Sequence, residues 1–88
     1  RYIEVNGHFL KYHLENEILI SRGKLDEKEE ELKNYGFFRI YKCYLVNLSY
    51  VDKVTVNSVF IGKEELLISR FRKKNFLAAL KDHVSDFI

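Results

Sequence analysis

The dipeptide Asn6-Gly7 is the feature that most restricts how this chain can fold, because it stands between two runs of strand-forming residues, 2–5 and 8–14. Both residues of an Asn-Gly pair tolerate a positive φ angle, which a two-residue type I′ loop requires. Such a pair between apolar, β-branched or aromatic segments is a strong hairpin signal. The sequence therefore predicts an antiparallel hairpin with Asn6-Gly7 as its loop.

Turn residues and residue propensities predict the elements that follow. A short strand is expected at residues 17–21, and Gly23 ends it. The strong helix formers of residues 24–34 then predict a helix, which Asn34 and Gly36 end. Strand character then returns, with hairpin-length loops between the last three strands, which indicates antiparallel pairing. These predicted strands span residues 37–46, 53–56, 59–61 and 65–68.

The C-terminal segment changes from strand to helical spacing. Its apolar side chains recur at the intervals of one helix face, with Lys81 and Asp82 between them; they are Phe76, Leu77, Leu80, Val84, Phe87 and Ile88. The expected fold is therefore mainly β, with antiparallel sheets, short helices, an acidic helix in mid-chain and a C-terminal helix. We see no domain boundary within residues 1–88.

Length and composition narrow the class of protein. The 88 residues suffice for one domain with a modest core, and 47% hydrophobic with 32% charged residues is typical of globular proteins. No run is apolar enough to span a membrane, and no segment resembles a signal peptide. Cys43 is the single cysteine, which excludes an intramolecular disulfide and favours a reducing, cytoplasmic location. Methionine is absent, so we expect the chain to be a fragment of a longer protein.

Charge is distributed unevenly along the chain. Residues 24–34 carry three positive and five negative charges, whereas residues 35–88 carry nine positive and five negative charges. A net charge of +2 does not by itself indicate nucleic acid. The asymmetry nevertheless makes the second half the place to look for an anionic partner.

Two segments concentrate the cations. One holds Arg39 and Lys42, which lie three residues apart and would occupy opposite faces of a continuous strand. The other, "SRFRKKNF" at residues 69–76, has four cations within five residues, where a strand runs into a helix. Hydroxyl, backbone amide and guanidinium groups at such a junction suit a phosphate or a guanine edge. Alternatively, Arg39 and Lys42 could be solvated charges that protect an edge strand from aggregation.

These segments resemble the LytTR DNA-binding domain, the output domain of many bacterial response regulators. The resemblance rests on "F-x-R-x-x-x-x-x-x-V-N" from Phe37 to Asn47, and on "I-S-R" followed by basic residues from Ile68. It covers nearly the whole chain, although the family's first strand, upstream of "YIE", is missing or truncated.

The resemblance implies sequence-specific binding of double-stranded DNA by a bacterial transcriptional regulator of a two-component system. Loops, not a recognition helix, would enter successive major grooves, with contacts in the minor groove between them. Two copies would bind direct repeats in a promoter, dimerised through a regulatory domain that precedes this chain. The residues that the resemblance places in contact with DNA are Asn6, His8, Arg39, Tyr41, Lys42, Ser69, Arg70, Arg72, Lys73 and Lys74.

Within this set, lysines would bind phosphates and arginines would read bases. We expect Lys42, Lys73 and Lys74 to contact the backbone, and Arg39, Arg70 and His8 to contact base edges. Many relatives have His-Arg-Ser or His-Asn-Ser where this chain has Tyr41, Lys42 and Cys43, so we expect a different sequence preference. The acidic helix should face away from DNA on charge grounds. Asn47 should cap the turn that follows it by bonding to the backbone two residues on.

Other classes of function find less support. There is no glycine-rich phosphate loop, no nucleophile with a paired histidine and no cluster at metal-ligand spacing. We therefore expect neither an enzyme nor a cofactor, metal, membrane or small-molecule site. The alternative, from a different class, is a protein-interaction β domain that does not bind DNA and uses the acidic helix and aromatic surface.

Overall fold

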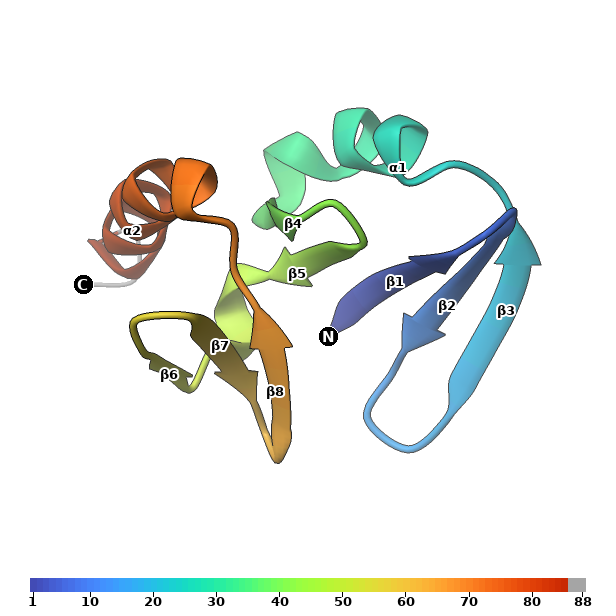
Figure 1. Ribbon diagram of the computed structural model, residues 1–88, viewed down its shortest axis with the longest axis horizontal. Coiled ribbons are helices and arrows are strands. Elements are labelled where there is room, and N and C mark those ends of the chain that lie inside the picture. The colour runs from blue at the N-terminus through green and yellow to red at the C-terminus, as the bar shows by residue number, and fades with distance from the viewer. Residues whose placement is uncertain (86–88) are drawn as a thin grey trace.

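A computed structural model describes residues 1–85 of the chain, which form two antiparallel sheets and two α-helices (Figure 1). The larger sheet has five strands in the order β3-β2-β1-β5-β4, and the smaller has three in the order β6-β7-β8. The predicted fold class, mainly β with antiparallel sheets and two helices, is confirmed. Within the described residues, neither helix is long and apolar enough to cross a membrane.

The first three strands form a meander. They are β1 (Tyr2–Asn6), β2 (Phe9–His13) and β3 (Ile18–Arg22). The predicted first hairpin is confirmed, but its loop is shifted by one residue: Asn6 pairs with Phe9, so Gly7-His8 is the loop. Gly7 has a φ of 63°, and a type II′ loop needs its glycine at this first position. The predicted type I′ loop at Asn6-Gly7 is therefore wrong in register.

The acidic helix α1 spans Leu25–Leu32 and continues as a 3₁₀ turn, Lys33–Tyr35. It ends at Gly36, whose φ of 80° is left-handed, so the predicted stop at this glycine is confirmed.

The continuous strand expected at residues 37–46 is wrong, because the chain reverses at Lys42-Cys43. It forms β4 (Phe37–Tyr41) and β5 (Tyr44–Asn47), with an irregular register between Arg39 and Tyr41. Lys42 therefore lies in a turn and not on a strand face.

The second half continues the antiparallel pattern. Asn47 begins a 3₁₀ turn, Leu48–Tyr50, and its side chain accepts a hydrogen bond from the Ser49 amide at 3.0 Å, as predicted. The smaller sheet contains β6 (Lys53–Val54), β7 (Ser58–Ile61) and β8 (Glu64–Leu67), and it leads into α2 (Arg70–Ser85). The predicted helix positions Phe87 and Ile88 lie outside the described residues.

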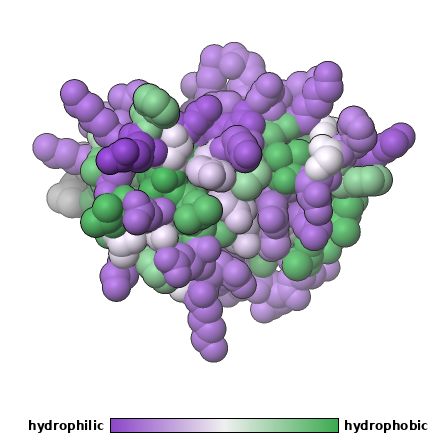
Figure 2. All heavy atoms as spheres, in the orientation of Figure 1, coloured by the Kyte–Doolittle hydropathy of each residue, from purple (hydrophilic) through white to green (hydrophobic). Residues whose placement is uncertain are grey.

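Two clusters of buried side chains lie on opposite faces of the five-stranded sheet. Successive residues of a strand point to opposite faces, so Leu45 belongs to one cluster and Val46 to the other. The Leu45 cluster packs against α1 through Leu25. The Val46 cluster joins the two sheets and holds α2 through Phe76, which is fully buried. Hydrophilic side chains project around most of the outline, with apolar patches between them (Figure 2).

Candidate nucleic-acid interface

The loop Gly7-His8 and the turn Lys42-Cys43 project from the same end of the five-stranded sheet. Strand β1 runs antiparallel to both β2 and β5, with Glu4 opposite Tyr44. Beyond this pair, the Val5 amide donates to the Cys43 carbonyl at 3.0 Å. The pairing of β1 thus brings together two segments that are 34 residues apart in the sequence.

The last residue of β3 lies at this same end of the five-stranded sheet. Arg22 pairs with Phe9, and the Gly23 amide donates to the His8 carbonyl at 3.1 Å. His8, Arg22 and Lys24 together line a shallow depression with Gly23. Arg22 and Lys24 were not among the predicted contacts. The signal that points to them is "RGK", two cations around a glycine at the end of a predicted strand.

The start of α2, which follows the last strand of the smaller sheet, also lies at this end of the larger sheet. The Ser69 amide donates to the Ile40 carbonyl at 2.7 Å, which ties the residue before α2 to the end of β4. A second depression, of about 370 Å³, is lined by both segments, through Tyr41, Lys42, Ser69, Phe71 and Arg72. Residues of two predicted basic segments therefore meet in space.

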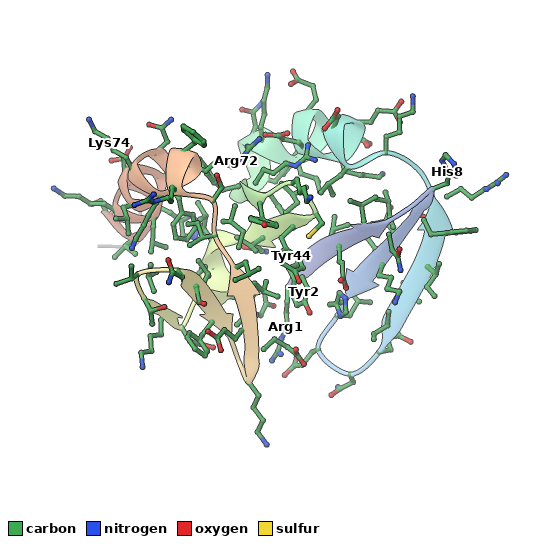
Figure 3. All side chains as sticks on the ribbon, viewed as in Figure 1. Arg1, Tyr2, His8, Tyr44, Arg72 and Lys74 are labelled. Carbon is green, nitrogen blue, oxygen red and sulfur yellow. The ribbon has the colours of Figure 1, made fainter. Side chains whose placement is uncertain are left out.

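We call this cationic surface the basic edge and define it by His8, Arg22, Lys24, Lys42, Arg70 and Arg72. Figure 3 shows His8 at one end of the molecule's longest axis, Lys74 toward the other end, and Arg72 between them on the same side. The longest axis measures 35 Å. Cations from three separate segments, together with the His8 imidazole, thus line two neighbouring parts of the surface.

Arg39 is turned inward, unlike the residues of the basic edge. Its side chain is 12% exposed and donates to Asp26 and, at 3.2 Å, to Glu29, both on α1. The same guanidinium donates to the carbonyls of Tyr41 and Lys42. Burial lowers the pKa of Arg39, but the hydrogen bonds that its guanidinium donates to the two carboxylates raise it overall. Arg39 therefore joins the acidic helix to the turn that carries Lys42.

Asp26 stands between two cations. The hydrogen bond from Arg39, together with the Arg39 charge, lowers the pKa of Asp26, and the more distant charge of Arg72 adds to this effect. The acidic helix was expected to face away from DNA. Its first turn pairs with Arg39, and the orientation of the helix relative to DNA stays a prediction.

The remaining predicted residues differ in how far they are available to a ligand. Arg70 and Lys74 are exposed and make no ion pair or side-chain hydrogen bond with residues 1–85. Lys73 is half-buried, and its ammonium donates to the Val56 carbonyl at 2.9 Å. Asn6 is an exposed residue at the end of β1, and Tyr41 is half-buried at the end of β4.

Cys43 is half-buried in the turn beside Lys42. Burial, with the negative charge of Glu4, raises the pKa of its thiol. Across residues 1–85 no group of three or more His, Cys, Asp or Glu side chains is placed to hold a metal ion.

Fold and site together define a small β domain that presents cations from its loops and from the start of a helix at one end of the larger sheet. The family model of the LytTr DNA-binding domain matches residues 1–81, and the chain belongs to this family. The predicted family is therefore confirmed. As a member of a family of DNA-binding domains, the chain is assigned to DNA binding in transcription regulation.

A solved structure has the same fold. It is described as the LytTr DNA-binding domain of a response regulator from Bacillus cereus, and it superposes with a TM-score of 0.77 at 19% identity. The match covers 90% of this chain and 78% of that chain. No relative is found among curated proteins.

Proposed function

We propose that this chain binds double-stranded DNA sequence-specifically, and that the basic edge reads the major groove. The observation that carries the proposal is that cations from three separate segments come together with the His8 loop at one end of the larger sheet and the start of α2. Such a surface supplies phosphate contacts, and it presents arginine forks that match the acceptor pair of guanine.

The size of the domain suits one turn of duplex. Successive major grooves on one side of B-DNA lie about 34–36 Å apart, and the longest axis of the domain is 35 Å. His8 would lie in one groove and the residues of α2 from Arg70 to Lys74 would reach toward the next, while Lys42 would lie over the minor groove between them. This arrangement uses the loops and the start of α2 and places no helix along a groove.

Each contact receives a separate role. Arg70 is free to make a bidentate contact with guanine, and His8 would contact a base edge at the other end. Lys24, Lys42 and Lys74 are exposed and would bind phosphates. Phosphate binding by Lys73 stays a prediction, because its ammonium would have to exchange the Val56 carbonyl for the phosphate.

We assign Arg39 a positioning role in place of the predicted base contact. A guanidinium already shared among two carboxylates and two carbonyls has few donors left for a base. It would instead hold the Lys42 turn in the conformation that meets DNA. Base reading by Arg39 remains the competing prediction, and the unfolding free energy and base preference of Arg39→Ala separate the two roles.

The proposal extends to the wider protein. Two copies would bind direct repeats in a promoter in the cytoplasm of a bacterium, joined by a regulatory domain that precedes this chain. Half-sites should be spaced at multiples of about 10–10.5 base pairs, since each copy must meet the same face of the duplex.

A protein-interaction domain is the second candidate. Every residue of the edge strand β3 is exposed, including Ile18, Leu19 and Ile20, which are 56%, 50% and 62% exposed. An unpaired apolar edge suits a partner strand.

Fluorescence anisotropy with random duplex DNA tests the proposal against this alternative. Three phosphate contacts predict that log Kd rises with log salt with a slope of about 2.7, which is about a 40-fold loss of affinity between 50 and 200 mM. No binding at 50 mM salt would contradict DNA binding and favour the interaction domain.

A further inference from the structure

Phe71 is 95% exposed, which makes it the most exposed large hydrophobic side chain within residues 1–85. The next are Val56 at 78% and Tyr35 at 74%. A single exposed apolar residue is common on protein surfaces. Phe71 differs because its surroundings are strongly cationic.

Helical spacing explains why Phe71 cannot reach the core. The inward stripe of α2 is marked by Phe76, which is fully buried, and by the partly buried Ala79 and Leu80 that pack on the same cluster. Phe71 precedes Phe76 by five residues, about 140° around the helix, and so points outward. It lies on the same side as Lys74, three residues on.

Cations surround this exposed ring. Arg70 and Arg72 flank it in sequence, and the depression that Phe71 lines also contains Lys42 and Arg72. An apolar surface among cations suits a ligand that is anionic overall and offers an apolar group close to its charges. The major groove of DNA has this combination, because the thymine C5-methyl group lies between two phosphate backbones.

We propose that Phe71 is a specificity-determining residue that contacts the C5-methyl group of a thymine, beside the base read by Arg70. This inference rests on the proposed function, since it requires the basic edge to enter the major groove. The ring would bury one of its faces against the methyl group while the neighbouring cations hold the backbone. A cytosine at the same position lacks the methyl group and would be disfavoured.

The experiment begins with a duplex that the 88-residue chain selects from a random pool. Each thymine is then replaced in turn by deoxyuridine, which removes the methyl group and keeps the Watson–Crick edge. For the unaltered chain, replacement of one particular thymine should weaken binding about fourfold. This is the effect expected from one buried methyl group, since 1.4 kcal/mol corresponds to a tenfold change in affinity. For Phe71→Ala, the same replacement should change the affinity by less than about 1.5-fold.

Tyr35→Ala is the matched control, because Tyr35 is also a highly exposed aromatic residue but precedes β4, at the end of the sheet opposite the basic edge. This variant should respond to deoxyuridine as the unaltered chain does, and Phe71→Leu should recover part of the response. Equal unfolding free energies for the variants would show that folding is unchanged.

The outcomes separate this inference from the proposed function. If Phe71→Ala weakens binding while deoxyuridine has no effect on the unaltered chain, the methyl contact is wrong, and a wedge between base steps would explain the loss. If neither change has an effect although salt-dependent binding persists, Phe71 has no role and the basic edge still binds DNA. Absence of all DNA binding overturns both.

Discussion

Arg39 and Arg70 carry the same guanidinium group in opposite surroundings. Arg39 is 12% exposed and paired with two carboxylates, whereas Arg70 is exposed at the start of α2. A buried charge that loses its partners is costly, while a solvated one is not. Replacement of Arg39 should therefore affect folding, and replacement of Arg70 should affect recognition.

Arg70→Lys should relax sequence specificity while non-specific binding stays close to normal. Lysine keeps the charge but lacks the planar fork that contacts guanine in two places, a contact worth about 1–3 kcal/mol of discrimination. The measurement is the ratio of specific to non-specific Kd at one salt concentration. An unchanged ratio would exclude Arg70 as a base-reading residue.

Asp26 should make stability depend on pH in the acid range. Its pKa is lowered in the folded chain, so its contribution is present above the ordinary aspartate pKa and is lost as the pH falls through the lowered value. The unfolding free energy of the unaltered chain should therefore decline more steeply below about pH 4 than that of Asp26→Asn. Urea titrations between pH 2.5 and 6 measure this difference, and parallel curves for the two proteins would contradict it.

At the scale of elements, Arg39 links α1, β4 and the Lys42 turn. Arg39→Ala should lower the unfolding free energy by about 1 kcal/mol, because it removes the donor to the Tyr41 and Lys42 carbonyls of the turn. It should also weaken binding to all DNA sequences alike, since the turn would lose its support. Urea unfolding and site selection are the two readouts.

The competing base-reading role of Arg39 predicts a different result. Arg39→Ala would then relax preference at one base pair, with little change in the unfolding free energy. Lys63→Ala serves as a control, because Lys63 is an exposed cation in the β7–β8 loop, at the end of β8 opposite α2.

Elements with strong local signals could be predicted from the sequence. The hairpin at Gly7, the helix stop at Gly36 and the cap at Asn47 each depend on a residue whose own chemistry fixes the local backbone. The reversal at Lys42-Cys43 has no such local signal, because neither residue is typical of turns. Two carbonyls of that reversal are satisfied by Arg39, whose side chain is in turn held by α1.

The candidate site could be predicted in part, for the same reason. The cations of residues 70–74 are adjacent in sequence and were found. Arg22 and Lys24 join His8 only through the pairing of β2 with β3, and Asp26 meets Arg39 across 13 residues of sequence. Local spacing contains no information about such contacts, which the tertiary fold creates.

At the scale of the whole molecule, phosphate contacts should add along the 35 Å length. Lys42→Ala and Lys74→Ala should each lower the salt slope by about 0.9, because each removes one released counterion. The slope is measured from Kd at several salt concentrations on one duplex. Lys63→Ala should leave the slope unchanged, and an equal reduction in that variant would indicate general charge attraction.

None of the six residues of the basic edge belongs to either described core cluster. Mutations there can therefore accumulate at little expense to folding, so lineages can acquire new operator preferences while the scaffold is inherited unchanged. Divergence among homologues should concentrate at these loop tips, and grafting them between relatives is a practical route to retargeting such a regulator.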